Sequence, residues 1–279
     1  MFWILLLISI VVLLSIKLIF CIAPGKMSPE AKNTAKIFYG LNCAHRGLHT
    51  ENQQTPENSL SAFAAAHEKG YGTELDVHLS KDGQVVVFHD DDLKRACGMD
   101  DPINSLEWKE LSAISLFNTL EKIPLLSDAL EVLGDSPIII ELKPSGAKNA
   151  ELCQKTLEIL RKHGQYWCIE SFDPRICAWF RKNAPDVLRG QLSTSPRTFK
   201  TPSKLKAFFL GNLLCNFISR PHFIAYKAVP HPLLVRLCYL MKPMTAAWTI
   251  LPENDIAKLE NENDTIIFEY YSPKPRYKK

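Results

Sequence analysis

The sequence predicts an α/β protein, a TIM (β/α)₈ barrel that follows one N-terminal transmembrane helix. The first observation is the apolar segment from Met1 to Ala23, in which Lys17 is the only charged residue. The second is size, because removing these 23 residues from the 279 leaves 256, close to the roughly 250 of such barrels. The third is the alternation of strand-like and helix-like patterns over the rest of the chain, which is typical of βαβ units in a parallel sheet.

Composition excludes several other classes of protein. With 46% hydrophobic residues and a net charge of +3, the chain is too apolar and too weakly charged to be disordered. Its 12 Gly and 18 Pro follow no collagen-like period. A mean hydropathy of −0.07 is too low for a protein with many membrane spans. The small net charge does not indicate a nucleic-acid partner.

The N-terminal apolar segment is long enough to cross a bilayer, because a spanning helix needs about 20 mostly apolar residues. Lys17 could reach the membrane interface with its long side chain. A cleaved signal peptide and a buried or amphipathic helix are the alternatives. No basic residue precedes the apolar run, and Cys21-Ile22-Ala23 is a poor cleavage site. We therefore expect an anchor over 1–23, a juxtamembrane linker over 24–40 and a barrel over 41–279.

The flanking charges predict the orientation of this anchor. Lys26, Lys32 and Lys36 follow the span and no basic residue precedes it. By the positive-inside rule, we expect a single-pass protein of the cell membrane whose catalytic domain is cytoplasmic. The eight cysteines form no CxxC pair, and buried free thiols are the simplest interpretation of them.

The elements of the barrel follow in order along the chain. A turn signal at residues 81–84 makes 85–88 an antiparallel hairpin return after the second strand. Residues 90–125 break the alternation and predict an insertion with a short helix around 106–111. The expected strands are 43–44, 73–79, 85–88, 138–142, 167–171, 187–192, 223–226, 245–250 and 265–268. The expected helices are 59–69, 126–133, 150–163, 174–183, 203–217, 232–241 and 253–261.

The helix expected over 203–217 is apolar around much of its circumference. One interpretation is a buried outer helix of the barrel. The other is a patch against the bilayer that holds a lipid-like substrate near the site. The sequence leaves both open.

Two polar clusters follow the first strands, at the carboxyl ends where barrel enzymes assemble their sites. His45 and Arg46 come directly after the first strand, and Glu74 and Asp76 lie two apart on the second. That spacing aims both carboxylates at the barrel interior, where two like charges are costly unless a cation or protons intervene. The alternative interpretation of Glu74 and Asp76 is that both lie on a strand face that is exposed to solvent. Oxygen ligands of this kind suit Mg²⁺ or Ca²⁺.

Two further clusters belong to the same predicted mouth. His89 ends the hairpin, and Glu141 and Lys143 flank Leu142 after a very apolar strand. A structural ion pair is the alternative for Glu141 and Lys143 alone. Together, the four clusters predict metal-assisted attack on a phosphate ester.

With these residues the chain resembles the glycerophosphodiester phosphodiesterase family. The similarity runs from about Leu41 to the end, and its N-terminal half is specific because several short motifs occur in the family's order. The motifs are His45-Arg46-Gly47, Pro56-Glu57-Asn58-Ser59, Glu74-Leu75-Asp76-Val77, Lys81-Asp82-Gly83, His89-Asp90, Ile123-Pro124-Leu125-Leu126, Glu141-Leu142-Lys143, Ser171-Phe172-Asp173 and Trp248-Thr249.

The resemblance implies a TIM barrel that uses a divalent cation to hydrolyse glycerophosphodiesters to an alcohol and glycerol 3-phosphate. It implies that His45 and His89 are the general acid and base. The implied metal ligands are Glu74, Asp76 and Glu141.

The resemblance also implies roles for the cationic and aromatic residues. Arg46 and Lys143 would neutralise the phosphate oxygens, and Glu57 would support His45 and Arg46 or touch the ligand. Phe172 and Trp248 match the family's later strand ends as supporting or substrate-contacting residues. Core packing is the alternative for Trp248.

Two departures from the family pattern are visible. Ser59 replaces the usual Thr, and the segment from Ile267 to Pro273 only loosely matches a Thr-Asp-x-Pro-like end of the last strand. Lysophospholipase D activity on lysophospholipids is the alternative function, and a non-catalytic membrane-tethered barrel is the alternative from another class. The sequence leaves open the head group, the metal, the oligomeric state and whether water or the substrate's own hydroxyl attacks.

Overall fold

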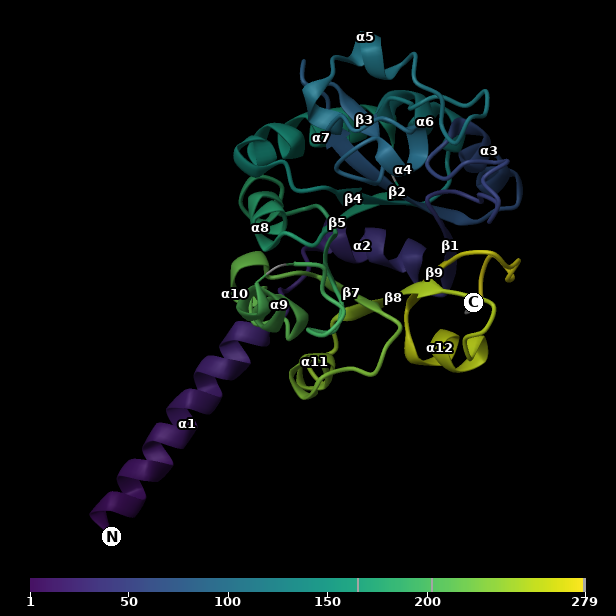
Figure 1. Ribbon diagram of the computed structural model, residues 1–279. Coiled ribbons are helices and arrows are strands. Elements are labelled where there is room, and N and C mark those ends of the chain that lie inside the picture. The colour runs from purple at the N-terminus through teal and green to yellow at the C-terminus, as the bar shows by residue number, and fades with distance from the viewer. Residues whose placement is uncertain (165, 202, 278–279) are drawn as a thin grey trace.

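The computed structural model describes residues 1–164, 166–201 and 203–277, and over these the predicted closed barrel is confirmed (Figure 1). Eight parallel strands pair in the ring β1-β2-β4-β5-β6-β7-β8-β9, and β9 pairs back with β1. Their bounds are β1 (Leu41–His45), β2 (Gly72–Leu79), β4 (Ile138–Leu142), β5 (Trp167–Ser171), β6 (Arg189–Ser193), β7 (Phe223–Lys227), β8 (Met244–Ile250) and β9 (Thr265–Phe268).

The predicted hairpin and insertion follow β2. The short strand β3 (Val85–Val87) pairs antiparallel with β2 after a turn in which Gly83 has a φ of +78°. The insertion has its own small apolar cluster, which includes Leu93, Ile103 and Leu116. Its short helices are α4 (Lys94–Cys97), the 3₁₀ turn η1 (Ile103–Ser105) and α5 (Trp108–Leu111).

Helices cover the outside of the ring. They are α3 (Leu60–Glu68), α6 (Leu126–Leu133), α7 (Asn149–His163, after the 3₁₀ turn η2, Gly146–Lys148), α8 (Pro174–Asn183), α9 (Lys204–Gly211), α10 (Asn216–Ser219), α11 (Leu233–Tyr239) and α12 (Ile256–Glu262). Side-chain caps set several of their starts, as where Ser59 accepts a hydrogen bond from the Ala62 amide and Asp173 from the Arg175 amide.

The single helix expected over 203–217 is wrong, because the chain turns between α9 and α10. Leu213 adopts a left-handed φ of +59°, which a continuous α-helix does not allow. Leu210, Leu213 and Leu214 are buried, whereas Phe208 and Phe209 are exposed. Some side chains of the segment therefore lie in the core and others on the surface, and the interpretation as a patch against the bilayer stays a prediction.

A helix that the sequence did not reveal lies within the expected linker. Residues Pro29–Phe38 form α2, whose N-cap Ser28 accepts a hydrogen bond from the Ala31 amide. Ala31, Ala35 and Phe38 are buried against side chains at the amino ends of the strands. Because α2 closes that end of the barrel, most of the segment between the apolar helix and β1 belongs to the packed fold.

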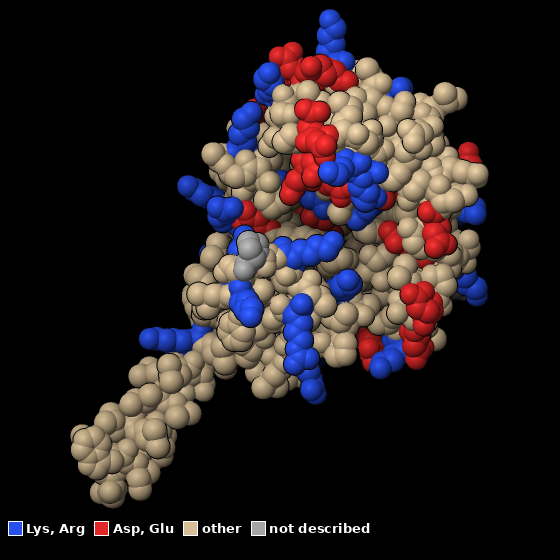
Figure 2. All heavy atoms as spheres, in the orientation of Figure 1, with Lys and Arg blue, Asp and Glu red and all other residues tan. Residues whose placement is uncertain are grey.

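The first helix, α1 (Phe2–Ile22), extends away from the body of the molecule (Figure 1). Its most apolar window is 0% buried, and it is long and apolar enough to be a membrane span or a signal sequence. Figure 2 shows it as a projecting rod with tan atoms over most of its length. Only its last turn is in contact with the barrel, where Ile22 is buried.

Candidate active site

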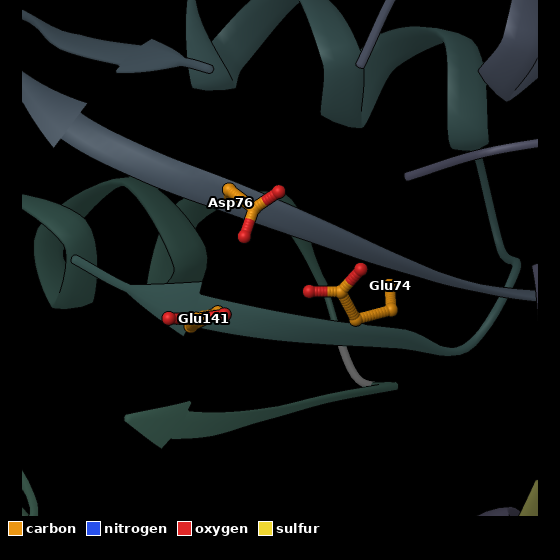
Figure 3. Close-up of side chains that lie close together, drawn as sticks. All are labelled: Glu74, Asp76 and Glu141. Atoms are coloured by element: carbon orange, nitrogen blue, oxygen red, sulfur yellow. The ribbon is translucent and has the colours of Figure 1, made fainter. Parts of the chain in front are cut away.

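Three carboxylates converge inside the barrel near the carboxyl ends of β2 and β4. Glu74 and Asp76 come from β2, and Asp76 is in register with Glu141 on β4. One oxygen atom of each lies within 4.8 Å of the others, and all three side chains are buried (Figure 3). The structure therefore brings together the three residues expected to hold a metal ion.

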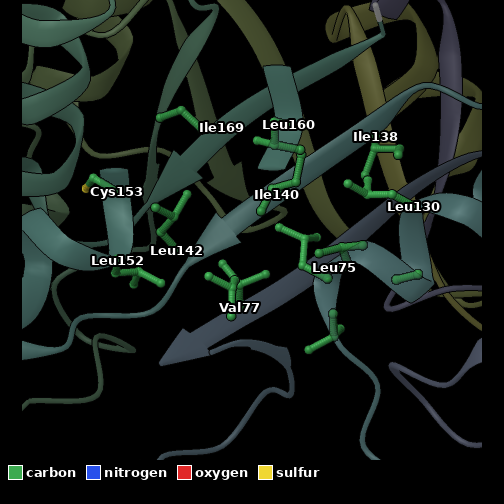
Figure 4. Packing of buried hydrophobic residues seen from close by; sticks show 14 of the residues in the cluster. Leu75, Val77, Leu130, Ile138, Ile140, Leu142, Leu152, Cys153, Leu160 and Ile169 are labelled. Atoms are coloured by element: carbon green, nitrogen blue, oxygen red, sulfur yellow. The ribbon is translucent and has the colours of Figure 1, made fainter. Parts of the chain in front are cut away.

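The opposite faces of the same strands explain why these carboxylates point inward. Leu75 and Val77 of β2, with Ile140 and Leu142 of β4, belong to an apolar cluster beneath the outer helices (Figure 4). Strand side chains alternate between two faces, so packing these four outward places Glu74, Asp76 and Glu141 inside.

Two cationic side chains face the carboxylates. Lys143 Nζ lies 2.7 Å from Asp76 Oδ1 and 2.9 Å from Glu141 Oε2. Arg46 Nε lies 3.5 Å from Asp76 Oδ2, and the Arg46 amide donates to Glu74 Oε2. Burial alone would raise the pKa of Asp76, but Lys143, His89 and Arg46 hold it well below its usual range. Asp76 is therefore an anion in the folded protein.

The pKa values of the other two carboxyl groups, Glu74 and Glu141, are raised instead of lowered. Burial and then the neighbouring carboxylates raise the pKa of Glu74 well above its usual value. Burial raises the pKa of Glu141 to about 7, although Lys143 opposes this, and Glu141 Oε1 is buried without a hydrogen-bond partner in the described structure. A cluster of oxygen donors with too little positive charge around it fits a hard divalent cation such as Mg²⁺ or Ca²⁺.

His45, at the end of β1, is fixed by a carboxylate from the last strand end. Its Nδ1 lies 2.5 Å from Glu269 Oε1, and its Nε2 lies 3.7 Å from Glu74 Oε2. A carboxylate accepts from Nδ1–H, an assignment inferred from this contact, so Nε2 faces the acidic cluster. Burial lowers the pKa of His45, as does Arg46, while Glu269 opposes both.

His89, just beyond β3, has a similar arrangement. Its Nδ1 lies 2.6 Å from Asp90 Oδ1, and Asp90 in turn accepts from Arg95 Nε at 2.7 Å. Burial lowers the pKa of His89, and the charge of Asp76 opposes this. Both histidines are thus held through Nδ1 by a carboxylate, and Nε2 of each ring takes no part in that contact.

Glu57 lies between two guanidinium groups at the rim of the site. It accepts hydrogen bonds from Arg46 Nη1 at 2.7 Å and from Arg95 Nη2 at 2.6 Å. Burial would raise the pKa of Glu57, but these two arginines lower it. Glu57 therefore supports Arg46, and no contact of it with His45 is recorded among the described residues.

Phe172 and Trp248 lie side by side at the same end of the barrel. Phe172 follows β5 and Trp248 belongs to β8, and their ring centroids are 5.6 Å apart in an edge-to-face arrangement. Phe199, in the segment between β6 and α9, also packs edge-to-face on Phe172, with ring centroids 5.6 Å apart. These rings give one side of the mouth an aromatic wall.

The site contains residues that sequence reasoning missed. Glu269 was not expected, because the end of the last strand matched the family pattern only loosely. Asn58 Nδ2 donates to Asp76 Oδ2 at 2.8 Å, and Arg95 comes from the insertion. None of these contacts has a periodic signal in the sequence.

A fourth buried carboxyl group, Glu170 on β5, is in register with Glu141. Burial and the charges of Glu141 and Asp76 raise its pKa well above the usual value. Strand alternation could have found it, since Cys168 of the same strand also faces the interior cluster.

A closed parallel barrel with carboxylates, cations and two histidines at the carboxyl ends of its strands has the arrangement of a TIM-barrel enzyme. The family model described as the glycerophosphoryl diester phosphodiesterase family matches residues 45–268. The chain therefore belongs to this family, as the order of its motifs predicts.

Individual relatives agree with this membership. A human lysophospholipase D is 33% identical over 141 residues, which cover 46% of this chain and 43% of the human protein. A glycerophosphodiester phosphodiesterase of Caldanaerobacter subterraneus is 31% identical over 163 residues, which cover 54% of this chain and 66% of that protein. The chain thus matches less than two thirds of the length of these curated relatives.

The barrel is also similar to solved structures. A phosphodiesterase of Oleispira antarctica, solved in complex with sn-glycerol-3-phosphate, aligns with a TM-score of 0.67 at 24% identity. The alignment covers 84% of this chain and 94% of that one. At this identity the likeness shows the shared fold.

The contact between His45 and Glu269 leads to a prediction for the Glu269→Gln variant. The amide keeps the shape of the side chain but removes the negative charge that stabilises the imidazolium. We expect the pKa of His45 to fall by roughly 1 or more, since an opposite charge at this range shifts a pKa by about 1 to 3. NMR titration of histidine-labelled protein in micelles measures it.

Glu253→Gln is the matched control, because Glu253 is exposed. Its titration curve for His45 should coincide with that of the unchanged protein. Equal midpoints for Glu269→Gln and the unchanged protein would contradict the electrostatic role of Glu269.

Proposed function

We propose that this protein is a metal-dependent phosphodiesterase that hydrolyses glycerophosphodiesters to an alcohol and glycerol 3-phosphate. The observation that carries the proposal is the convergence of His45 and His89 with the three buried carboxylates at one barrel mouth. Family membership supports it, and so does the likeness to a phosphodiesterase solved with sn-glycerol-3-phosphate.

Glu74, Asp76 and Glu141 would hold the divalent cation, Mg²⁺ or Ca²⁺. When bound, the cation would polarise a phosphoryl oxygen and offset the negative charge that develops there. The residues themselves supply the rest of the electrostatic complementarity. Burial lowers the pKa of Lys143, but Asp76 and Glu141 outweigh this and raise it above the usual range, so Lys143 keeps its proton.

Arg46 and Lys143 would bind the remaining phosphate oxygens. Arg46 is held in place by Glu57, and Lys143 by Asp76 and Glu141. Because both cations are positioned before the substrate arrives, they need little reorganisation as charge develops on phosphorus.

The two histidines would balance the protons of the reaction. One ring takes the proton of the attacking hydroxyl through Nε2, and the new P–O bond forms. The other ring gives a proton through Nε2 to the oxygen of the departing alcohol as its bond to phosphorus breaks. Water, or the substrate's own glycerol hydroxyl through a cyclic phosphate, can be the nucleophile in this scheme.

Replacing either histidine tests the acid–base assignment. We expect His45→Ala and His89→Ala each to lower kcat on glycerophosphocholine by at least about 100-fold, because general acid–base catalysis contributes about that much or more. The measurement is steady-state release of glycerol 3-phosphate by the full chain in micelles.

His67→Ala is the control, since His67 is exposed on α3 and its side chain hydrogen-bonds to Ser136. It should retain activity within about twofold of the unchanged protein. Full activity in His45→Ala would remove that residue from the mechanism. No turnover by the unchanged protein on any phosphodiester would support the non-catalytic barrel.

Removal of the cation tests the carboxylate assignment. We expect EDTA to abolish turnover and Mg²⁺ or Ca²⁺ to restore it, because Asp76 and its neighbours lack enough positive charge. Glu74→Gln should weaken cation binding measured directly by calorimetry, whereas Glu151→Gln, at an exposed ion pair with Lys155, should not. Turnover that is indifferent to EDTA would contradict the metal-dependent reaction.

A second candidate function is lysophospholipase D activity. The similarity to a human protein of that name favours it, and so does the aromatic wall formed by Phe172, Trp248 and Phe199. Aromatic rings at the mouth could pack against the glycerol and the first carbons of an acyl chain.

Parallel assays separate the two substrates. If the lipid is the substrate, Trp248→Ala should raise KM for long-chain lysophosphatidylcholine about tenfold or more, because the loss of one buried aromatic contact is worth more than 1.4 kcal/mol. Turnover of glycerophosphocholine should change much less. Activity on the soluble diester alone would exclude the lipid version.

The placement of the protein follows from α1 and its flanking charges. We propose that α1 anchors the barrel in the cell membrane as an uncleaved single span. Lys26, Lys32 and Lys36 follow the span, which favours a catalytic barrel on the cytoplasmic side.

A further inference from the structure

We propose that the barrel rests on the membrane through a second contact beside α1. The surface is formed by α9, α10 and α11, and its partner is a bilayer surface that contains anionic lipids. We call this surface the α9–α11 face, defined by the exposed side chains of Leu205, Phe208, Phe209, Phe217, Leu233 and Leu240.

The last turn of α1 is fixed to this face. Arg220, directly after α10, donates from Nη1 to the carbonyls of Phe20 and Ala23 at 2.9 Å each, and its guanidinium lies 4.2 Å from the Phe20 ring centroid. Asn216 of α10 donates to the Ile22 carbonyl at 2.9 Å. Because α10 satisfies carbonyls at the end of α1, the helix leaves the barrel in a set direction.

The length of α1 brings the fixed turn to the edge of the bilayer. Its 21 residues rise about 31 Å, which matches the roughly 30 Å of hydrocarbon that a spanning helix must cross. The helix cannot span unless its last turn, near Lys17 and Phe20, reaches the interface. The side chains that hold this turn must then lie at the interface too.

Apolar side chains are exposed around that point. Leu205 on α9 is 68% exposed, and Leu233 and Leu240 at the ends of α11 are 67% and 76% exposed. Phe217 on α10 is exposed and contacts Phe20 of α1, with ring centroids 6.4 Å apart. The apolar surface of the span therefore continues onto the barrel. Exposure of such a continuous apolar surface to water is unfavourable.

The chain segment that contains α9, α10 and α11 carries only positive charges. Between Asp186 and Glu253 the chain has no acidic residue, but it has nine basic ones: Arg189, Arg197, Lys200, Lys204, Lys206, Arg220, Lys227, Arg236 and Lys242. The whole chain carries only +3, so everything outside this segment sums to −6. In Figure 2 the charged side chains on the part of the body next to α1 are mostly blue Lys and Arg, among tan atoms.

Most of these basic side chains are available to lipid head groups, whereas Lys227 Nζ lies 6.0 Å from the ring centroid of Trp248 at the mouth. Seven of the nine are exposed, all except Arg189 and Arg220, and none of the seven has an ion pair recorded within the described part of the chain. Lys204 and Lys206 flank Leu205, and Arg236 lies between Leu233 and Leu240. Exposed apolar and basic residues side by side are typical of interfacial helices, and each basic residue near an anionic surface contributes about 1 kcal/mol.

Depth-dependent fluorescence quenching tests this contact in the full chain reconstituted in nanodiscs. The partly exposed Cys21, Cys97 and Cys215 are replaced by Ala, and the other five cysteines are buried. A single NBD label is then placed at Leu205→Cys or Leu240→Cys. Leu120→Cys is the control of the same residue type, 96% exposed and in the segment between α5 and α6, far from α1 (Figure 1).

In discs of phosphatidylcholine and phosphatidylglycerol, we expect lipids with a nitroxide at carbon 5 to quench the labels at 205 and 240. Iodide in the buffer should quench these two labels little and the label at 120 strongly. Equal iodide quenching at all three positions would overturn the contact. Shielding from iodide without nitroxide quenching would mean that protein covers the face, which also overturns the lipid assignment.

The charge is tested separately in the same labelled proteins. Replacing phosphatidylglycerol with phosphatidylcholine, or introducing Lys204→Glu and Lys206→Glu together, should lower nitroxide quenching at position 240. Quenching that stays the same in both cases would overturn the role of anionic lipid. The contact rests on the proposed span of α1, but the readout needs no enzymatic turnover, so the result is independent of the proposed phosphodiesterase activity.

Discussion

The burial of like charges inside the barrel is the constraint on which the site depends. Glu74, Asp76, Glu141 and Glu170 all face the interior and all are buried. Such a group of carboxylates is stable only if cations, protons or hydrogen bonds compensate it. Lys143 and Arg46 supply part of the compensating positive charge, while burial and the neighbouring carboxylates raise the pKa of Glu74, Glu141 and Glu170. The negative charge that Lys143 and Arg46 leave uncompensated makes the cluster of Glu74, Asp76 and Glu141 a candidate site for a cation.

The amino end of the barrel is packed with apolar side chains, whereas the carboxyl end carries the polar side chains of the candidate site. At the amino end, α2 places Ala31, Ala35 and Phe38 against the first residues of the strands, so this end is packed and apolar. At the carboxyl end, carboxylates hold the histidines and Glu57 holds Arg46. The stability of the barrel and the chemistry of its mouth thus rest on separate layers of side chains, as in other barrels of this type.

The proposed membrane contact and the mouth are neighbours in the fold. The segment that leads from β6 to α9 carries Phe199, which packs on Phe172 beside Trp248. Phe199 thus joins the aromatic wall at the mouth to the segment that leads into α9.

The sequence by itself determined the fold class and predicted most of the residues that the structure brings together at the candidate site. Alternating patterns predict the eight strands, and two-residue spacing aims Glu74 and Asp76 to one side, because these are local properties of a strand. Only the tertiary structure showed that Glu269 and Asp90 hold the histidines, that α2 closes the barrel and that α10 fixes α1. Each of these joins residues that are distant along the chain or that lack a periodic signal, as with His45 and Glu269, which meet only because β9 pairs back with β1. The net charge of +3 likewise hid a basic segment that follows Asp186, since a sum over the chain cannot show where the charges lie.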